Sequence, residues 1–210
     1  MLIFDLDGTL LNTIDDLYNA LNYALSYHGF KQKTLTETKM LLGNGIECLV
    51  AGAIDNGKES PNFEATYHTF KTYYSAHIND CTKPYDGIIP LLKTLKNKNI
   101  KTGIVSNKYD EGVQKLATEY FTGLIDKAQG TSKTIQKKPS PDAIFALIKE
   151  LKAENEKNIY IGDSEVDILT AQNANLPCVS VSWGFRSKEQ LLATNAKIII
   201  DKPQDLLKLI

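Results

Sequence analysis

Two patterns of hydrophobic residues divide the chain into a helical part and a mixed part. Between residues 15 and 80, apolar residues recur at the three- and four-residue spacing of an amphipathic helix, and no strand pattern interrupts them. This spacing predicts four helices, at about residues 16–28, 36–42, 46–53 and 63–78. We therefore expect residues 15–81 to form a small all-helical domain.

After Cys81 the pattern changes to short apolar runs that alternate with helical stretches. Strands are predicted at 102–106, 124–128, 158–161, 178–182 and 197–200. Helices are predicted at 88–96, 111–120, 141–152, 165–173, 188–193 and 203–210. Such alternation indicates an α/β fold, in which helices cover both faces of a parallel sheet. Right-handed crossovers make this sheet open and doubly wound.

One further strand is predicted before the helical part. Leu2, Ile3 and Phe4 form a short apolar run that stops abruptly at Asp5. We expect a core domain of residues 1–14 and 82–210, with the helical cap domain inserted after its first strand. An insertion at this point lies above the carboxyl ends of the strands, where doubly wound sheets bind ligands. It can therefore act as a lid that excludes water from a reaction.

The composition restricts the classes of function. Hydrophobic and charged contents of 42% and 23% are ordinary for a globular enzyme. The net charge of −1 gives no field that would attract nucleic acid or an acidic membrane. Arg186 is the only arginine, so lysines and backbone N–H groups must bind any phosphate. The sequence predicts neither a membrane span nor a signal peptide, and its three cysteines without a paired motif suit a reducing cytoplasm.

Two carboxylates stand where the first strand ends. Asp5 and Asp7 are two residues apart, and in extended chain their side chains point to the same side, roughly 7 Å apart. Like charges this close repel unless a cation or a shared proton relieves them. Gly8 allows a sharp turn, and Thr9 adds a hydroxyl group. The pattern is typical of a site for a hard cation with one carboxylate left for chemistry, although an acidic turn alone would also read this way.

Three more polar groups follow predicted strands or open predicted helices. Ser106 and Asn107 end one strand and can donate hydrogen bonds to phosphoryl oxygens. Lys138 precedes Pro139 just before a helix, although Lys137 is an alternative. Asp163 follows another strand, with Asp167 one helical turn beyond it. Taken singly, these signals are also those of a turn, a solvated lysine and a helix cap.

Together the four segments resemble the motifs of the haloacid dehalogenase superfamily of phosphotransferases. The matching residues are DLDGTL at 5–10, SN at 106–107, KKPSP at 137–141 and GDSEVD at 162–167, in the family's order. The resemblance implies that Mg²⁺ is held by Asp5, by Asp163 and by the backbone carbonyl of Asp7. It implies that Asp5 is the nucleophile, that Asp7 is the acid and base, and that Lys138 is catalytic and, with the motif at 106–107, binds the phosphoryl group. Since dehalogenating members lack the second aspartate, Asp7 favours phosphoryl transfer.

The loop between the second and third predicted helices bears on the substrate. Gly43, Asn44 and Gly45 resemble the cap loop of phosphoglycolate phosphatase-like members, in which such a segment reaches into the site. We thus expect Asn44 and Gly45 to contact a small phosphorylated metabolite. The loop has no basic residue to grip a second phosphate, which weighs against a sugar phosphomutase. A pyrophosphatase, a nucleotide phosphatase and a non-catalytic binding module remain alternatives, and the oligomeric state is not indicated.

Overall fold

The computed structural model describes residues 1–210, and the chain divides into two compact units. The core unit consists of Met1–Asn12 and Pro84–Ile210, and the helical unit consists of Thr13–Lys83. At the two points where the chain passes between the units, β2 (Leu11–Asn12) and β3 (Lys83–Pro84) form a two-stranded sheet.

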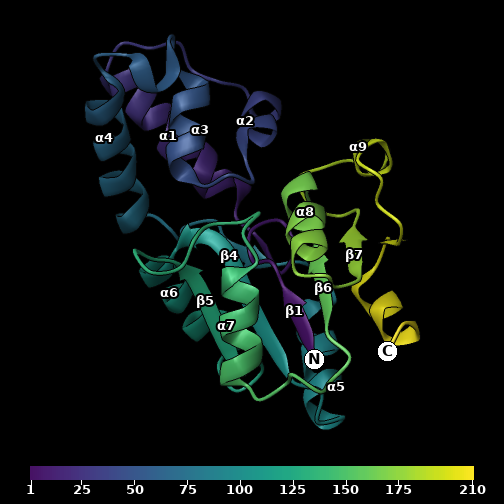
Figure 1. Ribbon diagram of the computed structural model, residues 1–210. Helices are drawn as coiled ribbons and strands as arrows, with labels where there is room; N and C mark the ends of the chain where they lie inside the picture. The colour runs from purple at the N-terminus through teal and green to yellow at the C-terminus, as the bar shows by residue number, and fades with distance from the viewer. The chain divides into compact units, whose positions relative to one another are not determined.

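The core unit contains a six-stranded parallel sheet with the strand order β5-β4-β1-β6-β7-β8. Its strands in chain order are β1 (Leu2–Phe4), β4 (Thr102–Tyr109), β5 (Lys127–Thr131), β6 (Ile159–Gly162), β7 (Cys178–Val181) and β8 (Ile199–Ile200). The central strand is β1, where Leu2 is level with Thr102 of β4 and with Ile159 of β6 (Figure 1). The strand order changes direction here, so the carboxyl end of β1 lies at a switch point.

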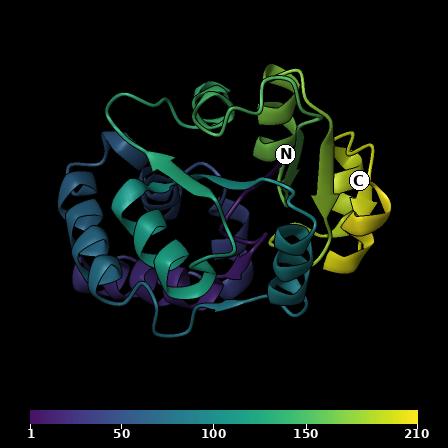
Figure 2. The ribbon, with the colours of Figure 1, turned by 90° about the horizontal axis from the view of Figure 1, so that it is seen from below.

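Helices cover both faces of this sheet (Figures 1 and 2). Helices α5 (Ile88–Asn97) and α6 (Asp110–Phe121) lie on one face, and α7 (Asp142–Glu150) and α8 (Glu165–Asn173) lie on the other. The chain ends with α9 (Lys188–Ala193) and the 3₁₀ helix η2 (Pro203–Lys208). These features confirm the predicted fold class, a doubly wound α/β sheet.

A buried apolar cluster joins the sheet to α7. Ile144 and Leu147 of α7 pack against Ile3 of β1 and Val105 of β4. Gly103 allows the close approach, because a Cβ atom there would overlap the side chain of Leu147. The central strands β1 and β6 are buried along their whole length and read as continuous runs rather than as alternating ones.

Three elements differ from the prediction in type or by three residues at one or both ends. The strand expected at 124–128 begins at Lys127, because Leu124 and Ile125 donate backbone hydrogen bonds to Phe121 and form the turn that ends α6. The helix expected at 203–210 is 3₁₀ and shorter. Strand β4 continues past Ser106 to Tyr109, and this extension shapes the site described below.

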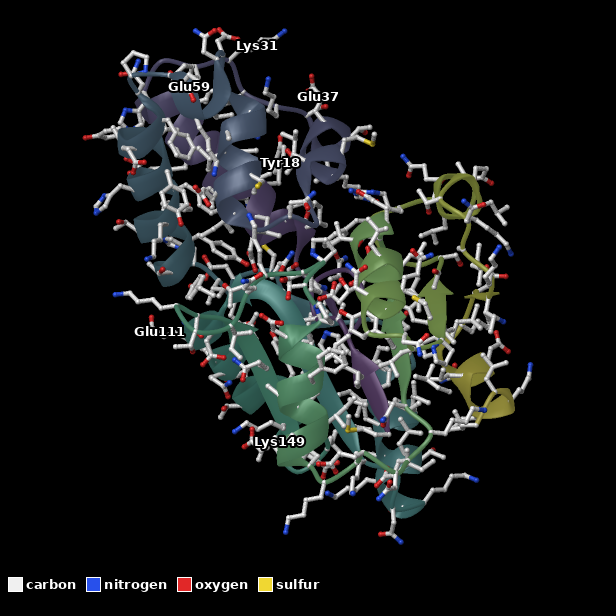
Figure 3. The ribbon with its side chains drawn as sticks, viewed as in Figure 1. Tyr18, Lys31, Glu37, Glu59, Glu111 and Lys149 are labelled. Atoms are coloured by element: carbon white, nitrogen blue, oxygen red, sulfur yellow. The ribbon has the colours of Figure 1, made fainter.

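The helical unit contains α1 (Ile14–Tyr27), α2 (Leu35–Leu41), α3 (Ile46–Ala53), η1 (Gly57–Glu59) and α4 (Phe63–Ala76). Its core is formed by apolar side chains that recur along α1 and α4, among them Leu17, Leu21, Leu25, Phe70 and Tyr74. Charged residues lie outside this core: Figure 3 shows Lys31, Glu37 and Glu59 extending from the surface of the unit. This is the expected arrangement for amphipathic helices.

A buried carboxylate ties the two ends of the helical unit together. Asp16, in the first turn of α1, accepts hydrogen bonds from the backbone N–H groups of Cys81 and Thr82, at 2.9 and 2.8 Å. The hydroxyl group of Thr82 donates a third bond at 2.7 Å. The start of α1 is thus joined to the segment that follows α4. No helix of the chain is long and apolar enough to cross a membrane.

Candidate active site

Three predicted site residues meet at the carboxyl ends of three adjacent strands. Asp5 follows β1, Ser106 lies in the last part of β4, and Asp163 follows β6. All three side chains are buried. Because β1 pairs with β4 on one side and β6 on the other, segments about 160 residues apart in the sequence come together here. The sheet topology therefore positions the site.

The turn after β1 is pressed against Asp163. Gly8 has a positive φ of 89°, and a Cβ atom at this position would overlap the Asp163 carboxylate. The hydroxyl group of Thr9 donates to Asp163 Oδ1 at 3.3 Å. From the other side, the backbone N–H of Phe185 donates to Asp163 Oδ2 at 2.7 Å. Only glycine satisfies both the backbone conformation and the close approach at position 8.

The ammonium group of Lys138 connects two of the carboxylates. Its Nζ atom lies 2.8 Å from Asp5 Oδ1 and 2.7 Å from Asp167 Oδ1, and the Lys138 side chain is only 4% exposed. Asn107 holds the Lys138 backbone: its Oδ1 accepts from the Lys138 N–H at 2.7 Å, and its Nδ2 donates to the Lys138 carbonyl at 3.1 Å. The Lys138–Pro139 peptide bond is cis. Lys138, rather than Lys137, is therefore the lysine at the site.

Asp167 accepts hydrogen bonds both from the start of α8 and from Lys138, and so fixes their relative positions. Its Oδ2 atom accepts hydrogen bonds from the backbone N–H groups of Asp163 and Ser164 and from the Ser164 hydroxyl group, at 3.2, 3.1 and 2.6 Å. Its Oδ1 atom accepts from Lys138 and from the hydroxyl group of Tyr160. Both carboxylate oxygens are thus fully used in positioning neighbouring groups.

The three buried carboxylates carry more charge than the lysine neutralises. One oxygen from each of Asp5, Asp163 and Asp167 lies within 4.8 Å of the others. Burial, and then the nearby Asp167, raises the pKa of Asp163 to about 7. Burial also raises the pKa of Asp5 well above its ordinary value, against the opposing effect of Lys138. When all three carboxylates are ionised, their charge exceeds that of Lys138 by two, and a divalent cation with oxygen ligands would balance this excess.

Asp7 lies outside this cluster and has a different partner. The Nζ atom of Lys108 lies 2.8 Å from Asp7 Oδ1, and the lysine side chain is 2% exposed, whereas Asp7 is 18% exposed. The hydroxyl group of Ser106 points to Asp7 Oδ2, at the long distance of 3.5 Å. The two carboxylates of the first motif therefore form ion pairs with different lysines, Asp5 with Lys138 and Asp7 with Lys108.

Lys108 was not among the predicted site residues. Its position follows from the extension of β4, because Ser106 and Lys108 are two residues apart in a strand and share one face. The Lys108 backbone is fixed as well, since its N–H donates to Ser106 Oγ at 3.2 Å. The strand periodicity, carried two residues past the apparent end, is the signal that could have found it.

The predicted loop residues Asn44 and Gly45 belong to the helical unit, between α2 and α3. Gly43 and Gly45 both have positive φ values, and Asn44 is exposed. Their contact with a substrate stays a prediction.

Comparisons with known proteins agree with this geometry. The model of the haloacid dehalogenase-like hydrolase family matches residues 2–181. The chain is 30% identical to phosphoglycolate phosphatase 1 of Pseudomonas aeruginosa, over 99% of this chain and 78% of the relative. It is 28% identical to the phosphoglycolate phosphatase of Aquifex aeolicus, over 100% and 95% of the two chains. A crystal structure of a proposed phosphoglycolate phosphatase from Lactobacillus delbrueckii subsp. bulgaricus superposes with a TM-score of 0.94, at 35% identity and with 100% and 97% coverage.

The doubly wound parallel sheet and the acidic site at its switch point are those of an enzyme with a Rossmann-like α/β fold. The chain belongs to the haloacid dehalogenase-like hydrolase family. Within it, the chain is a phosphoric monoester hydrolase that is similar to phosphoglycolate phosphatases. The family resemblance inferred from the four motifs is thus confirmed.

Proposed function

We propose that the protein is a Mg²⁺-dependent phosphatase that hydrolyses a small, phosphoglycolate-like phosphomonoester through an aspartyl-phosphate at Asp5. The observation that carries this proposal is the pairing of each first-motif carboxylate with its own buried lysine, Asp5 with Lys138 and Asp7 with Lys108. Such a division suits one carboxylate for attack and another for proton transfer. The names of the relatives support the substrate class.

The residues for a cation are Asp5, Asp163 and the backbone carbonyl of Asp7. Asp167 is not expected to be a ligand, because its two oxygens already accept five hydrogen bonds from the protein. The excess negative charge of the cluster and its all-oxygen donor set fit Mg²⁺. When bound, the ion supplies positive charge that neutralises the carboxylates and the phosphoryl oxygens.

In the first half-reaction a carboxylate oxygen of Asp5 attacks phosphorus, and the bond from phosphorus to the ester oxygen breaks. Asp7 gives its proton to the departing oxygen. In the second half-reaction Asp7 takes a proton from water, the water oxygen attacks phosphorus, and the bond to Asp5 breaks to release orthophosphate. Lys138 and Ser106 stabilise the phosphoryl oxygens throughout. Asn107 acts by holding the Lys138 backbone in place.

The cap domain, residues 15–81, is proposed to exclude water from this reaction. Asn44 and Gly45 are its proposed contacts with the substrate, since glycine permits close approach of the backbone to a small ligand. The loop has no basic residue, which disfavours a sugar phosphomutase. A pyrophosphatase or a nucleotide phosphatase is the second candidate. We also propose a cytoplasmic location, which the three cysteines without a disulfide support.

The test is phosphate release from a panel of phosphoglycolate, pyrophosphate, nucleotides and sugar phosphates, with Mg²⁺ and with a chelator. The wild type should release phosphate only with the ion, and Asp5→Asn should lower the rate by at least about 10⁴-fold, as expected for the loss of a nucleophile. Asp55→Asn, an exposed position in the helical unit, is the matched control and should keep full activity. Absence of release from every compound by the wild type would reject the hydrolase, and release by Asp5→Asn at the wild-type rate would reject the mechanism.

A further inference from the structure

Lys108 lies outside the four motifs, yet its pair with Asp7 is among the most buried ion pairs of the core unit. The Lys108 ammonium lies 2.8 Å from Asp7, and the lysine side chain is 2% exposed. The backbone is held on both sides, by the Lys108 N–H to Ser106 Oγ and by the Thr131 hydroxyl group to the Lys108 carbonyl, at 3.2 and 3.3 Å. A lysine is rarely buried to this extent, and the cost of its desolvation calls for an anionic partner.

The two buried lysines lie on opposite sides of the reaction. Lys138 contacts Asp5, which attacks phosphorus. Lys108 contacts Asp7, which serves the departing oxygen. In an in-line displacement the attacking and departing oxygens lie on opposite sides of phosphorus. If Asp7 serves the departing oxygen, the Lys108 ammonium beside Asp7 is on the leaving-group side.

No arginine can take this place. Arg186, the only arginine of the chain, forms a two-point ion pair with Glu165, with both nitrogen–oxygen distances at 2.8 Å. The charge that faces the leaving group is thus a single ammonium whose present partner, Asp7, is partly exposed. A small leaving group with its own negative charge can share that ammonium, and a neutral leaving group cannot.

We propose that Lys108 determines specificity by binding an anionic group on the alcohol part of the substrate, close to the ester oxygen. This inference rests on the proposed function and refines it. The substrate class that fits is a phosphomonoester whose leaving alcohol carries a carboxylate on the adjacent carbon. A sugar phosphate or an alkyl phosphate with a neutral leaving group lacks the recognised charge. Lys108 selects the substrate without entering the covalent steps.

The experiment compares two substrates of similar size, 2-phosphoglycolate and ethylene glycol monophosphate, in one enzyme. The wild type should favour 2-phosphoglycolate in kcat/KM by on the order of 10- to 100-fold, the range for a charged contact beside a second partner. Lys108→Met, which keeps the length of the side chain, should remove that preference mainly through KM. If the loss of the Lys108 ion pair also impairs Asp7, kcat/KM falls equally for both substrates, and the ratio of the two values is unchanged. Lys149→Met, at an exposed position on α7 (Figure 3), should leave the ratio unchanged.

Each outcome separates this inference from the proposed function. If Lys108→Met hydrolyses both compounds with the wild-type ratio, or if the wild type shows no preference, Lys108 does not select the leaving group, while the phosphatase stands. If the wild type releases no phosphate from either compound or from para-nitrophenyl phosphate, the phosphatase itself is rejected. If Lys108→Met does not fold, product inhibition of the wild type tests whether the site binds an anionic leaving group. Glycolate should inhibit at least ~10-fold more strongly than ethylene glycol, and equal inhibition would overturn the inference.

Discussion

Each residue of the site has little freedom, because neighbouring backbone segments approach it closely. Cβ atoms at Gly8 and Gly184 would both overlap Asp163, and one at Gly162 would overlap Asp167. Glycine backbone therefore packs directly against the carboxylates of Asp163 and Asp167. Such close approach is possible only where the residue has no side chain.

Gly8 gives the clearest prediction at this scale. In Gly8→Ala the new methyl group must displace the Asp163 carboxylate, and the positive φ adds a cost of about 1–2 kcal/mol. We expect a loss of phosphatase activity of about 100-fold, the effect of a displacement of roughly 1 Å at a catalytic group. Steady-state kinetics and urea unfolding measure the two effects separately.

Gly123→Ala is the matched control for this prediction. Gly123 has a similar positive φ of 74°, but nothing lies within 4 Å of its would-be Cβ atom. This variant should lose stability and keep its activity. Equal activities of the two variants would show that the approach of Gly8 to Asp163 has no part in function.

The sequence predicted the residues that the motifs contain, but not every contact among them. Asp5, Ser106 and Asp163 meet at the strand ends as expected, because parallel strands bring distant segments to one edge of the sheet. Lys108 was missed because its burial depends on how far β4 continues, which is set by pairing of β4 with β5 and not by local preference. The amide of Asn107 bonds the Lys138 backbone, a contact that the motif alone does not indicate, and its contact with the phosphoryl group stays a prediction.

At the scale of elements, the carboxylate of Asp16 joins α1 to the segment that follows α4 by hydrogen bonds. One side chain accepts three hydrogen bonds from Cys81 and Thr82, and it is 2% exposed. The chain therefore enters and leaves the helical unit at fixed neighbouring points.

Asp16→Asn should destabilise the helical unit by about 1–3 kcal/mol, because an amide nitrogen would face backbone donors that it cannot satisfy. Hydrogen exchange at the amides of Cys81 and Thr82 should become faster, and the midpoint of urea unfolding should fall. Asp15→Asn removes the same charge from the same first turn, but from an exposed side chain. If the amides of Cys81 and Thr82 exchange at the same rate in both variants, the hydrogen bonds of Asp16 contribute nothing to stability beyond its charge.

Element prediction failed where apolar residues serve a turn instead of a strand. Leu124 and Ile125 suggested the start of β5, yet their N–H groups bond the end of α6 and the strand begins at Lys127. Local hydrophobicity cannot distinguish the two, because both bury the side chain. The helical periodicity of α1 and α4, in contrast, extends over fourteen residues in each helix and located both.

At the scale of the whole molecule, the central claim is that the phosphoryl group is transferred to Asp5. The order of the strands makes this claim specific, because only one carboxylate at the switch point follows the central strand β1 and contacts Lys138. Asp163 and Asp167 come from the neighbouring β6 side, where Asp163 accepts one backbone hydrogen bond and Asp167 accepts two. This position and this contact are the reasons for proposing Asp5, and not Asp163 or Asp167, as the nucleophile.

The most direct measurement is to trap the intermediate. In Asp7→Asn, para-nitrophenyl phosphate can still transfer its phosphoryl group, since its leaving group needs no proton, but the hydrolysis step lacks its base. Borohydride reduction of the quenched enzyme converts an aspartyl-phosphate into homoserine, which mass spectrometry locates in the sequence. We predict homoserine at position 5 and at no other position. The double variant with Asp5→Asn and Asp7→Asn should contain no homoserine. Homoserine at position 163 or 167, or a burst of para-nitrophenol with no modified aspartate, would contradict the account.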